Sequence, residues 1–273
     1  MISYIIWDID PVIFDRFELF RWYGVCWVLG ILLGQKIMLN IFKAENVPAS
    51  ELDKLTLYVL LGGIIGARLG HILFYDPVYY INNPVEILPF RINPGFHFTG
   101  LSGLASHGGI LGALLGLYFY YRTSGRSYLW LLDRLVIAGA ALGAFIRVGN
   151  LMNSEMIGTP THLPWAFVFS NVDPVPRHPS QLYEAILYMV VSVSLYYTWK
   201  SKKFNTASGF IFGLGMISIF TVRFLVEFLK ENQMPFEENL ALNMGQVLSI
   251  PMIVAGIVLV IQSRRKSAIT WRG

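Results

Sequence analysis

Seven stretches of this 273-residue chain are apolar over the length of a membrane-spanning helix. A helix that crosses the hydrocarbon region of a bilayer needs about 20 residues. The stretches are 19–42, 55–75, 100–122, 129–152, 181–199, 207–229 and 244–262. Acidic residues precede the first stretch, where a cleavable signal peptide carries basic ones, so we expect this stretch to be retained. The pattern predicts an all-α, polytopic membrane protein with seven transmembrane helices in one domain, 1–273.

The charged residues between these stretches indicate how the chain is oriented. Lys and Arg concentrate in one set of segments, namely 43–54, 122–128, 200–206 and the tail from 263. They are sparse in the other set, where acidic residues predominate, namely 1–18, 76–99, 153–180 and 230–243. Cytoplasmic loops of membrane proteins are enriched in Lys and Arg. We therefore expect the N-terminus outside the cell and the C-terminus inside.

Composition excludes several other classes of protein. Hydrophobic residues make up 55% of the chain and charged residues 14%, with a mean hydropathy of +0.54, which excludes a disordered chain. Cys26 is the single cysteine, so no internal disulfide can form, and its apolar neighbours predict a buried core residue. The net charge is only +4 and the basic residues are scattered, which argues against a nucleic-acid partner.

Most polar side chains of the predicted spans lie near the outer ends of those spans. They are Arg21, Tyr23, Arg68, His71, His107, Arg147, His178, Gln181, Glu184 and Arg223. His107, for example, is about 10 Å below the outer boundary at a rise of 1.5 Å per residue. The polar residues near the inner ends are Lys36, Asp133 and Arg134. We expect their side chains to extend to the inner surface of the membrane. Ionisable groups inside a membrane mark function, and arginines suit a phosphate, so the pattern predicts one outer-leaflet site for a phospholipid headgroup.

Two runs concentrate small and polar residues on predicted helices. The run SGLASHGGILG at 102–112 surrounds His107 with glycines, which indicates either close helix packing or room for a ligand beside a proton-exchanging imidazole. The run IRVGNLMNSEMIG at 146–158 places Arg147, Asn150 and Asn153 on adjoining turns of one helix face. That face either binds a polar headgroup or caps the end of its own helix.

Two further runs lie at outer ends of later spans. In RHPSQLYE at 177–184, Pro179 can start a helix. In RFLVE at 223–227, Arg223 and Glu227 are spaced i, i+4, so they can form an internal salt bridge in which Glu227 orients Arg223. Signatures of soluble hydrolases and of phosphate-binding loops are missing, and the five histidines are too dispersed to predict a metal site.

Together these runs resemble the bacterial prolipoprotein diacylglyceryl transferases. The run at 146–158 is similar to the family signature, and RWYG at 21–24, SHGG, RHPSQLYE and RFLVEF follow the family's order. The resemblance implies seven spans with an outer N-terminus, in agreement with the charge pattern. It also implies a reaction: diacylglycerol passes from phosphatidylglycerol to the thiol of a lipobox cysteine, forming a thioether and releasing glycerol phosphate.

The resemblance carries the catalytic positions over to His107, Arg147, Arg223 and Tyr23. The transfer needs a base for the thiol and stabilisation of the departing phosphate, so His107 is the candidate general base, Arg147 and Arg223 are candidates for the phosphate, and Asn150 and Tyr23 are candidate hydrogen-bond partners. The implied phosphatidylglycerol-binding residues are Arg147, Asn150, Asn153, Glu155, Gly158, His178 and Glu227. Ile219 and Lys230 depart from the family, which has a tyrosine and an arginine near these positions.

The resemblance implies no metal and no cofactor. The implied partners are phosphatidylglycerol, a prolipoprotein signal peptide with its lipobox cysteine, and membrane lipids, with no nucleic acid. The implied location is the bacterial inner membrane. The alternative that the residues leave open is an outer-leaflet anion or phospholipid transporter. A transporter predicts inverted repeats and polar groups that continue to the inner face, and the sequence has neither.

Overall fold

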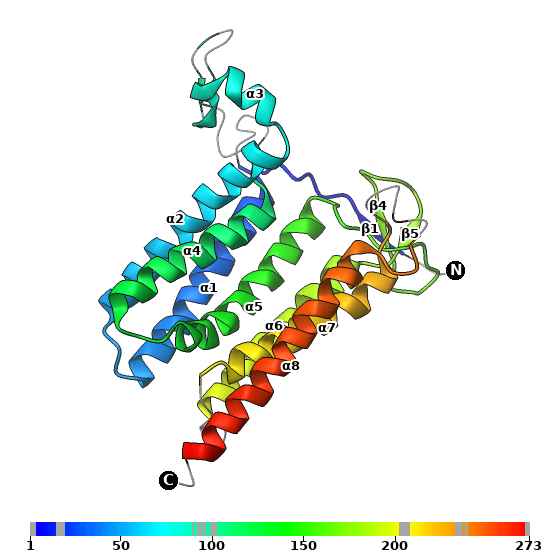
Figure 1. Ribbon diagram of the computed structural model, residues 1–273. Helices are drawn as coiled ribbons and strands as arrows, with labels where there is room; N and C mark the ends of the chain where they lie inside the picture. Colours follow the sequence, from blue (N-terminus) through cyan, green and yellow to red (C-terminus); the bar gives the residue numbers. More distant parts are fainter. Residues whose placement is uncertain are drawn as a thin grey trace. The chain divides into compact units, whose positions relative to one another are not determined.

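The chain is mostly helical (Figure 1). The computed structural model describes residues 4–14, 20–88, 90–91, 95, 97–98, 103–201, 208–232, 237 and 240–270. The long helices are α1 (Trp22–Ala44), α2 (Ala49–Phe74), α4 (Ser106–Ser124), α5 (Tyr128–Met152), α6 (Ser180–Lys200), α7 (Phe210–Val226) and α8 (Met244–Thr270). Each overlaps one predicted span. Residues 19, 100–102 and 207 of those spans lie outside the described residues.

Five of the described helices are long and apolar enough to cross a membrane. They are α1, α2, α5, α7 continued to Leu229, and α8. The other two long helices, α4 and α6, have 19 and 21 residues; α4 contains four glycines and three tyrosines, and α6 contains three serines and four tyrosines. The chain is therefore a mostly helical protein embedded in a membrane through several of its helices.

Short elements connect the helices, and the prediction of an all-α fold did not include the strands among them. Strands β1 (Ile5–Trp7), β4 (Phe167–Phe169) and β5 (Pro176–Arg177) form one sheet in the order β1-β4-β5. Strands β2 (Phe90–Arg91) and β3 (His97–Phe98) pair antiparallel. The remaining short elements are α3 (Pro77–Asn82) and the 3₁₀ turns η1 (Pro84–Ile87) and η2 (Glu227–Leu229). These segments are too short for hydrophobic periodicity to reveal them.

The chain divides into two compact units, Met1–Met38 with Leu129–Gly273, and Leu39–Tyr128. In the first unit, α7 packs against both α6 and α8. A Cβ added to Gly213 of α7 would lie 2.8 Å from the carbonyl oxygen of Gly256 in α8, so the two backbones touch there. Gly30 of α1 likewise faces Leu142 of α5. Cys26 is a buried residue of this unit, as predicted.

In the second unit, α2 and α4 pack through facing glycines. A Cβ on Gly66 would lie 2.4 Å from the carbonyl oxygen of Gly108, and one on Gly112 would lie 2.1 Å from that of Gly62. Side chains at these positions would force the two helices apart. Two of the glycines near His107 therefore serve helix packing.

Asp133 corrects one expectation from the sequence. Its side chain does not reach for the membrane surface, because the residue is only 3% exposed. Its carboxylate instead accepts hydrogen bonds from the backbone amides of Gly209 (2.8 Å) and Phe212 (2.7 Å). A helix begins with unpaired amides and a positive dipole end, so Asp133 of α5 caps the first turn of α7.

Candidate functional site

Arg147 is held on α5 by partners from two helices. Its Nε lies 2.8 Å from Oε2 of Glu184 on α6, and its Nη1 donates a 3.2 Å hydrogen bond to Oδ1 of Asn150 one turn further along α5. The Arg147 side chain is 13% exposed, and Glu184 is fully buried. The predicted polar face of α5 therefore exists, and its arginine is already ion-paired within the protein.

Glu184 also binds a second cation, Lys230. The Nζ atom of Lys230 lies 3.0 Å from Oε1 of Glu184 and 3.1 Å from Oε2 of Glu227. Glu227 and Lys230 are 6% and 5% exposed. Buried charges are tolerated only when they are paired. One buried charge network therefore joins the C-terminal end of α5, the first turns of α6 and the end of α7. Its members are Arg147, Glu184, Lys230 and Glu227.

The salt bridge between Arg223 and Glu227, which their spacing allowed, does not form. Glu227 pairs with Lys230 instead, and its carboxylate lies against Gly245 in the first turn of α8. The Arg223 side chain has no hydrogen bond or ion pair with any residue that the structure describes. Arg223 lies on α7 one helical turn before Glu227, a member of the charge network.

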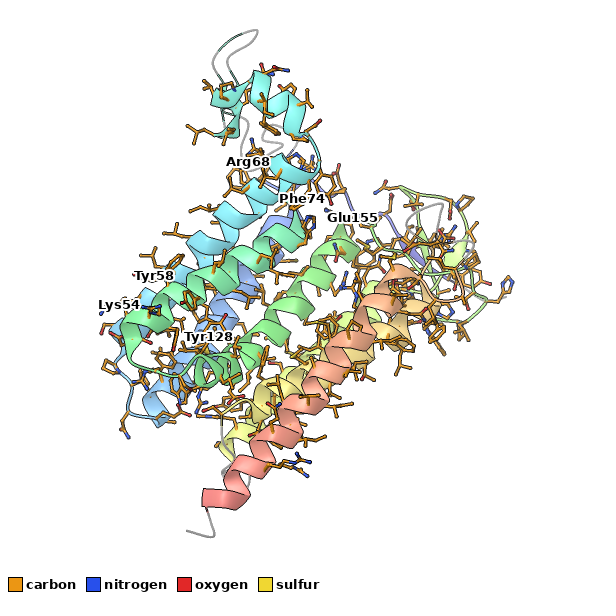
Figure 2. All side chains as sticks on the ribbon, in the orientation of Figure 1. Lys54, Tyr58, Arg68, Phe74, Tyr128 and Glu155 are labelled. Atoms are coloured by element: carbon orange, nitrogen blue, oxygen red, sulfur yellow. The ribbon has the colours of Figure 1, made fainter. Side chains whose placement is uncertain are left out.

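The end of α5 leads into a tight turn. Asn153 donates from Nδ2 to the carboxylate of Glu155, which lies at the C-terminal end of α5 (Figure 2). Ser154 and Met156 adopt positive φ angles of 55° and 56°. Buried oxygen atoms of Asn153, Ser154 and Gln181 have no hydrogen-bond partner among the described residues. Unpaired buried acceptors suit a ligand that brings hydroxyl donors.

Gly158 fixes the loop that follows this turn. Its amide donates a 3.1 Å hydrogen bond to the carbonyl oxygen of His178, and Thr159 donates one of 2.9 Å to the carbonyl oxygen of Leu229. Gly158 also forms a backbone bridge with Lys230. The role of Gly158 in this structure is to hold the segments around His178 and Lys230.

His178 and Arg177 precede α6 and lie outside the long helices. Nδ1 of His178 is 3.2 Å from the Tyr183 hydroxyl, and burial lowers the pKa of the imidazole below its usual value. Arg177 binds Asp173, with 2.6 Å between Nη2 and Oδ2, and also binds Glu231. The hydrogen bond from Arg177 lowers the pKa of Asp173 and raises that of Arg177.

Tyr23 lies near the polar face of α5. A Cβ on Gly149 would be 2.7 Å from Cδ2 of Tyr23, so the tyrosine ring rests on the turn of α5 that carries Asn150. The structure thus brings Tyr23, Arg147 and Asn150 into one region of the first unit.

His107 belongs to the second unit and lies in a group of aromatic rings. Its ring centroid is 5.9 Å from that of Tyr75 and 5.6 Å from that of Phe74, and Tyr75 stacks on His71 at 5.5 Å. Arg68 and Phe74 lie toward the C-terminal end of α2, whereas Lys54 and Tyr58 lie near its start (Figure 2). The His107 side chain is exposed and forms no hydrogen bond with the described residues.

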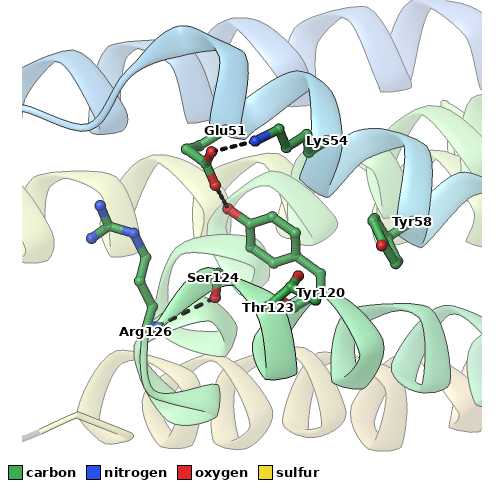
Figure 3. A pocket seen from close by; sticks show the side chains of 7 residues that line it. All are labelled: Glu51, Lys54, Tyr58, Tyr120, Thr123, Ser124 and Arg126. Carbon is green, nitrogen blue, oxygen red and sulfur yellow. Dashed lines mark hydrogen bonds and ion pairs between the residues drawn. The ribbon is translucent and has the colours of Figure 1, made fainter.

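A cavity of about 450 Å³ lies at the other end of the second unit (Figure 3). Its lining side chains bind one another: Glu51 accepts hydrogen bonds from Lys54 (2.9 Å) and from the Tyr120 hydroxyl (3.1 Å). It contains none of the predicted site residues. Among the described residues, no group of three or more His, Cys, Asp or Glu side chains is arranged to bind a metal.

Sequence reasoning did not identify Lys230 as a site residue. The signal was its position, because a lysine directly after an apolar span is unusual in the segments that are poor in Lys and Arg. Glu184 and Gln181 were noted at the start of a predicted span but received no role. Both are completely buried.

The fold and the site together define a polytopic helical membrane protein with a buried polar site where several helices end. A family model described as prolipoprotein diacylglyceryl transferase matches residues 11–262. Proteins named phosphatidylglycerol--prolipoprotein diacylglyceryl transferase are similar to this chain. The relative from Bacteroides fragilis is 45% identical over 255 residues, which cover 92% of each chain. The relative from Chloroherpeton thalassium is 41% identical over 267 residues, which cover 97% of this chain and 96% of the relative. The chain belongs to the prolipoprotein diacylglyceryl transferase family.

Proposed function

We propose that this chain transfers the diacylglyceryl group of phosphatidylglycerol to the lipobox cysteine of prolipoproteins, the first step of lipoprotein maturation. The relatives carry the name of this enzyme. The observation that supports it most strongly is Arg223, a cation beside a buried charge network with no ion-pair partner among the described residues. A phosphate ester fits such a position, because a guanidinium binds phosphate oxygens through two parallel hydrogen bonds.

The reaction exchanges one bond for another at a glyceryl carbon. The substrate thiol loses its proton, and its sulfur attacks that carbon. The carbon–oxygen bond to the phosphate breaks, so a thioether forms and glycerol phosphate leaves. The nucleophile belongs to the substrate, which is why a cysteine of the enzyme is not required.

Each site residue has a proposed role in this step. His107 accepts the thiol proton, since an imidazole exchanges protons near neutral pH. Arg223 and the remaining donors of Arg147 stabilise the charge on the departing phosphate. Tyr23 and Asn150 contribute hydrogen bonds at the polar face of α5, and the buried acceptors of Asn153 and Gln181 suit the hydroxyl groups of the glycerol headgroup.

The remaining members of the predicted site position the others. Glu227 is part of the charge network, and Gly158 fixes the backbone of His178 and Lys230. Glu155 binds the side chain of Asn153. We propose that these residues, together with His178, act by shaping the headgroup site.

The membrane arrangement is part of the same proposal. The chain is a single domain of the bacterial inner membrane that crosses it seven times, with the N-terminus outside and the C-terminus inside. The uneven distribution of Lys and Arg supports this orientation. A reporter that is active only in the cytoplasm, fused after Gly273, should be active, and a silent fusion would contradict the orientation.

The decisive experiment uses purified protein, phosphatidylglycerol and a synthetic lipobox peptide. The peptide should gain the mass of a diacylglyceryl group, and glycerol phosphate should appear in equal amount. A peptide with serine in place of the lipobox cysteine is the control and should remain unmodified. Movement of phosphatidylglycerol across vesicle membranes without peptide modification would instead support the transporter alternative.

A further inference from the structure

Lys230 is a buried lysine with two carboxylate partners. Its Nζ lies 3.0 Å from Glu184 and 3.1 Å from Glu227. Its backbone is fixed on both sides by the two hydrogen bonds of its bridge with Gly158, from the Thr159 amide to the carbonyl oxygen of Leu229 and from the Glu231 amide to that of Ile157. The ammonium group is therefore placed in the charge network by backbone structure as well as by attraction.

Glu227 is ion-paired with Lys230, its neighbour three residues along the chain. Arg223 and Glu227 are one helical turn apart, a spacing that favours a salt bridge between them. In the structure Glu227 binds Lys230 instead, and a Cβ on Gly245 would lie 2.5 Å from its carboxylate carbon. Gly245 is in the first turn of α8, where the positive end of the helix dipole favours a carboxylate.

The charges of the network balance without Arg223. Arg147 and Lys230 contribute two positive charges, and Glu184 and Glu227 contribute two negative charges. Arg223, one helical turn before Glu227, is then a cation in addition to these four charges.

We propose that Lys230 is a positioning residue for Arg223: by binding Glu227, it keeps the Arg223 guanidinium available for the phosphate of phosphatidylglycerol. This inference rests on the proposed function. It predicts that loss of the Lys230 charge releases Glu227 to pair with Arg223, and that this new pair competes with the phosphate.

The first test replaces Lys230 in the full-length protein. Lys230→Met should raise both the Kd and the KM for phosphatidylglycerol about tenfold or more, the scale of one charge-assisted contact. The Kd is measured in nanodiscs of a neutral lipid, so it reports binding even without a transfer assay. Lys230→Arg should retain most of the affinity, because arginine can also bridge two carboxylates. Lys54→Met, which removes an exposed lysine ion-paired with Glu51, is the control and should bind like wild type.

A double variant separates positioning from a merely structural role. Lys230→Met combined with Glu227→Gln removes one charge of each sign, so Arg147 and Glu184 stay paired and Arg223 loses Glu227 as a possible partner. The double variant should bind phosphatidylglycerol more tightly than Lys230→Met alone, whereas a structural role predicts equal or weaker binding. Thermal unfolding shows which variants are folded. If Lys230→Met does not fold, the phosphatidylglycerol affinity of the folded double variant is compared with that of Lys230→Arg.

Two results would overturn the inference: wild-type affinity in folded Lys230→Met, or a folded double variant that binds no better than the single one. If Lys230→Met does not fold, the inference is overturned by a folded double variant that binds phosphatidylglycerol far more weakly than Lys230→Arg does. Failure of the proposed function looks different, because the wild-type protein would then bind phosphatidylglycerol without modifying a lipobox peptide.

Discussion

The amide of Gly158 donates a 3.1 Å hydrogen bond to the carbonyl oxygen of His178, and a Cβ on Gly158 would lie 2.4 Å from that same oxygen. The carbonyl oxygen of Leu229 would be 2.7 Å from this Cβ. The absence of a side chain thus lets three backbone segments meet: the loop after α5, the residues before α6 and the residues after η2. The buried charge network depends on this meeting point, because Lys230 follows Leu229 directly.

Gly158→Ala should destabilise the protein and disturb this network. The added methyl group contacts backbone atoms that cannot rotate away, and forcing an extra carbon into a packed site costs about 1–3 kcal/mol. Thermal unfolding of the purified variant measures the loss. Gly139→Ala on α5 is the matched control, because a Cβ there meets no atom within 4 Å. Equal melting temperatures for the two variants would show that the backbone contact at Gly158 is unimportant.

The contact between α2 and α4 allows a similar comparison within one helix. Gly112→Ala should lower the thermal stability, because its Cβ would lie 2.1 Å from the carbonyl oxygen of Gly62. Gly109→Ala should be tolerated, because the nearest atom to its Cβ is the Ala67 Cβ at 3.4 Å, an ordinary contact. Melting temperatures measured side by side decide the matter, and an equally large loss in Gly109→Ala would contradict the proposed geometry.

Asp133→Ala should destabilise the start of α7. The two amides that Asp133 caps would lose their acceptor, and each unpaired buried amide costs about 1–3 kcal/mol. Asp133→Asn keeps one acceptor oxygen and should lose less. The exposed Asp53 provides the control, since Asp53→Ala removes a carboxylate that caps no helix in the described structure. A thermal stability of Asp133→Ala equal to that of Asp53→Ala would refute the capping role.

The sequence predicted the helices better than the contacts between them. Hydrophobic length alone located the seven long helices, but not the short α3, because an apolar span must form its own backbone hydrogen bonds in a membrane. Counting residues along the spans placed Arg147 and Glu184 near the same ends of their helices, where the structure pairs them. The pairing of Glu227 with Lys230, by contrast, depends on the backbone bridge between Gly158 and Lys230, which are far apart in the chain. Local spacing favoured Arg223 as the partner of Glu227.

Acidification should destabilise the protein in two steps. Burial holds the pKa of His178 below its usual value of about 6.5, so the unfolded chain binds this proton more readily than the folded protein. The stability that neutral His178 provides is therefore complete above about pH 6.5 and is lost as the pH falls through its lowered pKa. Asp173, whose pKa Arg177 lowers, adds a second loss at more acidic pH, below about 4.

Melting temperatures between pH 8 and pH 3 test this order. His178→Gln should remove the first decline and keep the second, whereas substitution of the exposed His162 by Gln should leave both. A first decline of unchanged size in His178→Gln would assign it to another group.

Arg147→Lys should impair transfer although it conserves the charge. Arg147 binds Glu184 through Nε and Asn150 through Nη1, and the single ammonium group of lysine lacks the planar arrangement that makes both contacts at once. Loss of one charge-assisted hydrogen bond is worth about 1.5–3 kcal/mol, which corresponds to one to two orders of magnitude in kcat/KM. Arg147→Ala should lose at least as much, because it also leaves Glu184 with Lys230 as its one remaining cation.

Arg122→Lys, at an exposed position on α4, should transfer diacylglycerol at the wild-type rate. The assay is transfer from phosphatidylglycerol to a lipobox peptide at equal amounts of folded protein. Full activity in both Arg147 variants would mean that Arg147 neither orients the network nor stabilises the departing phosphate.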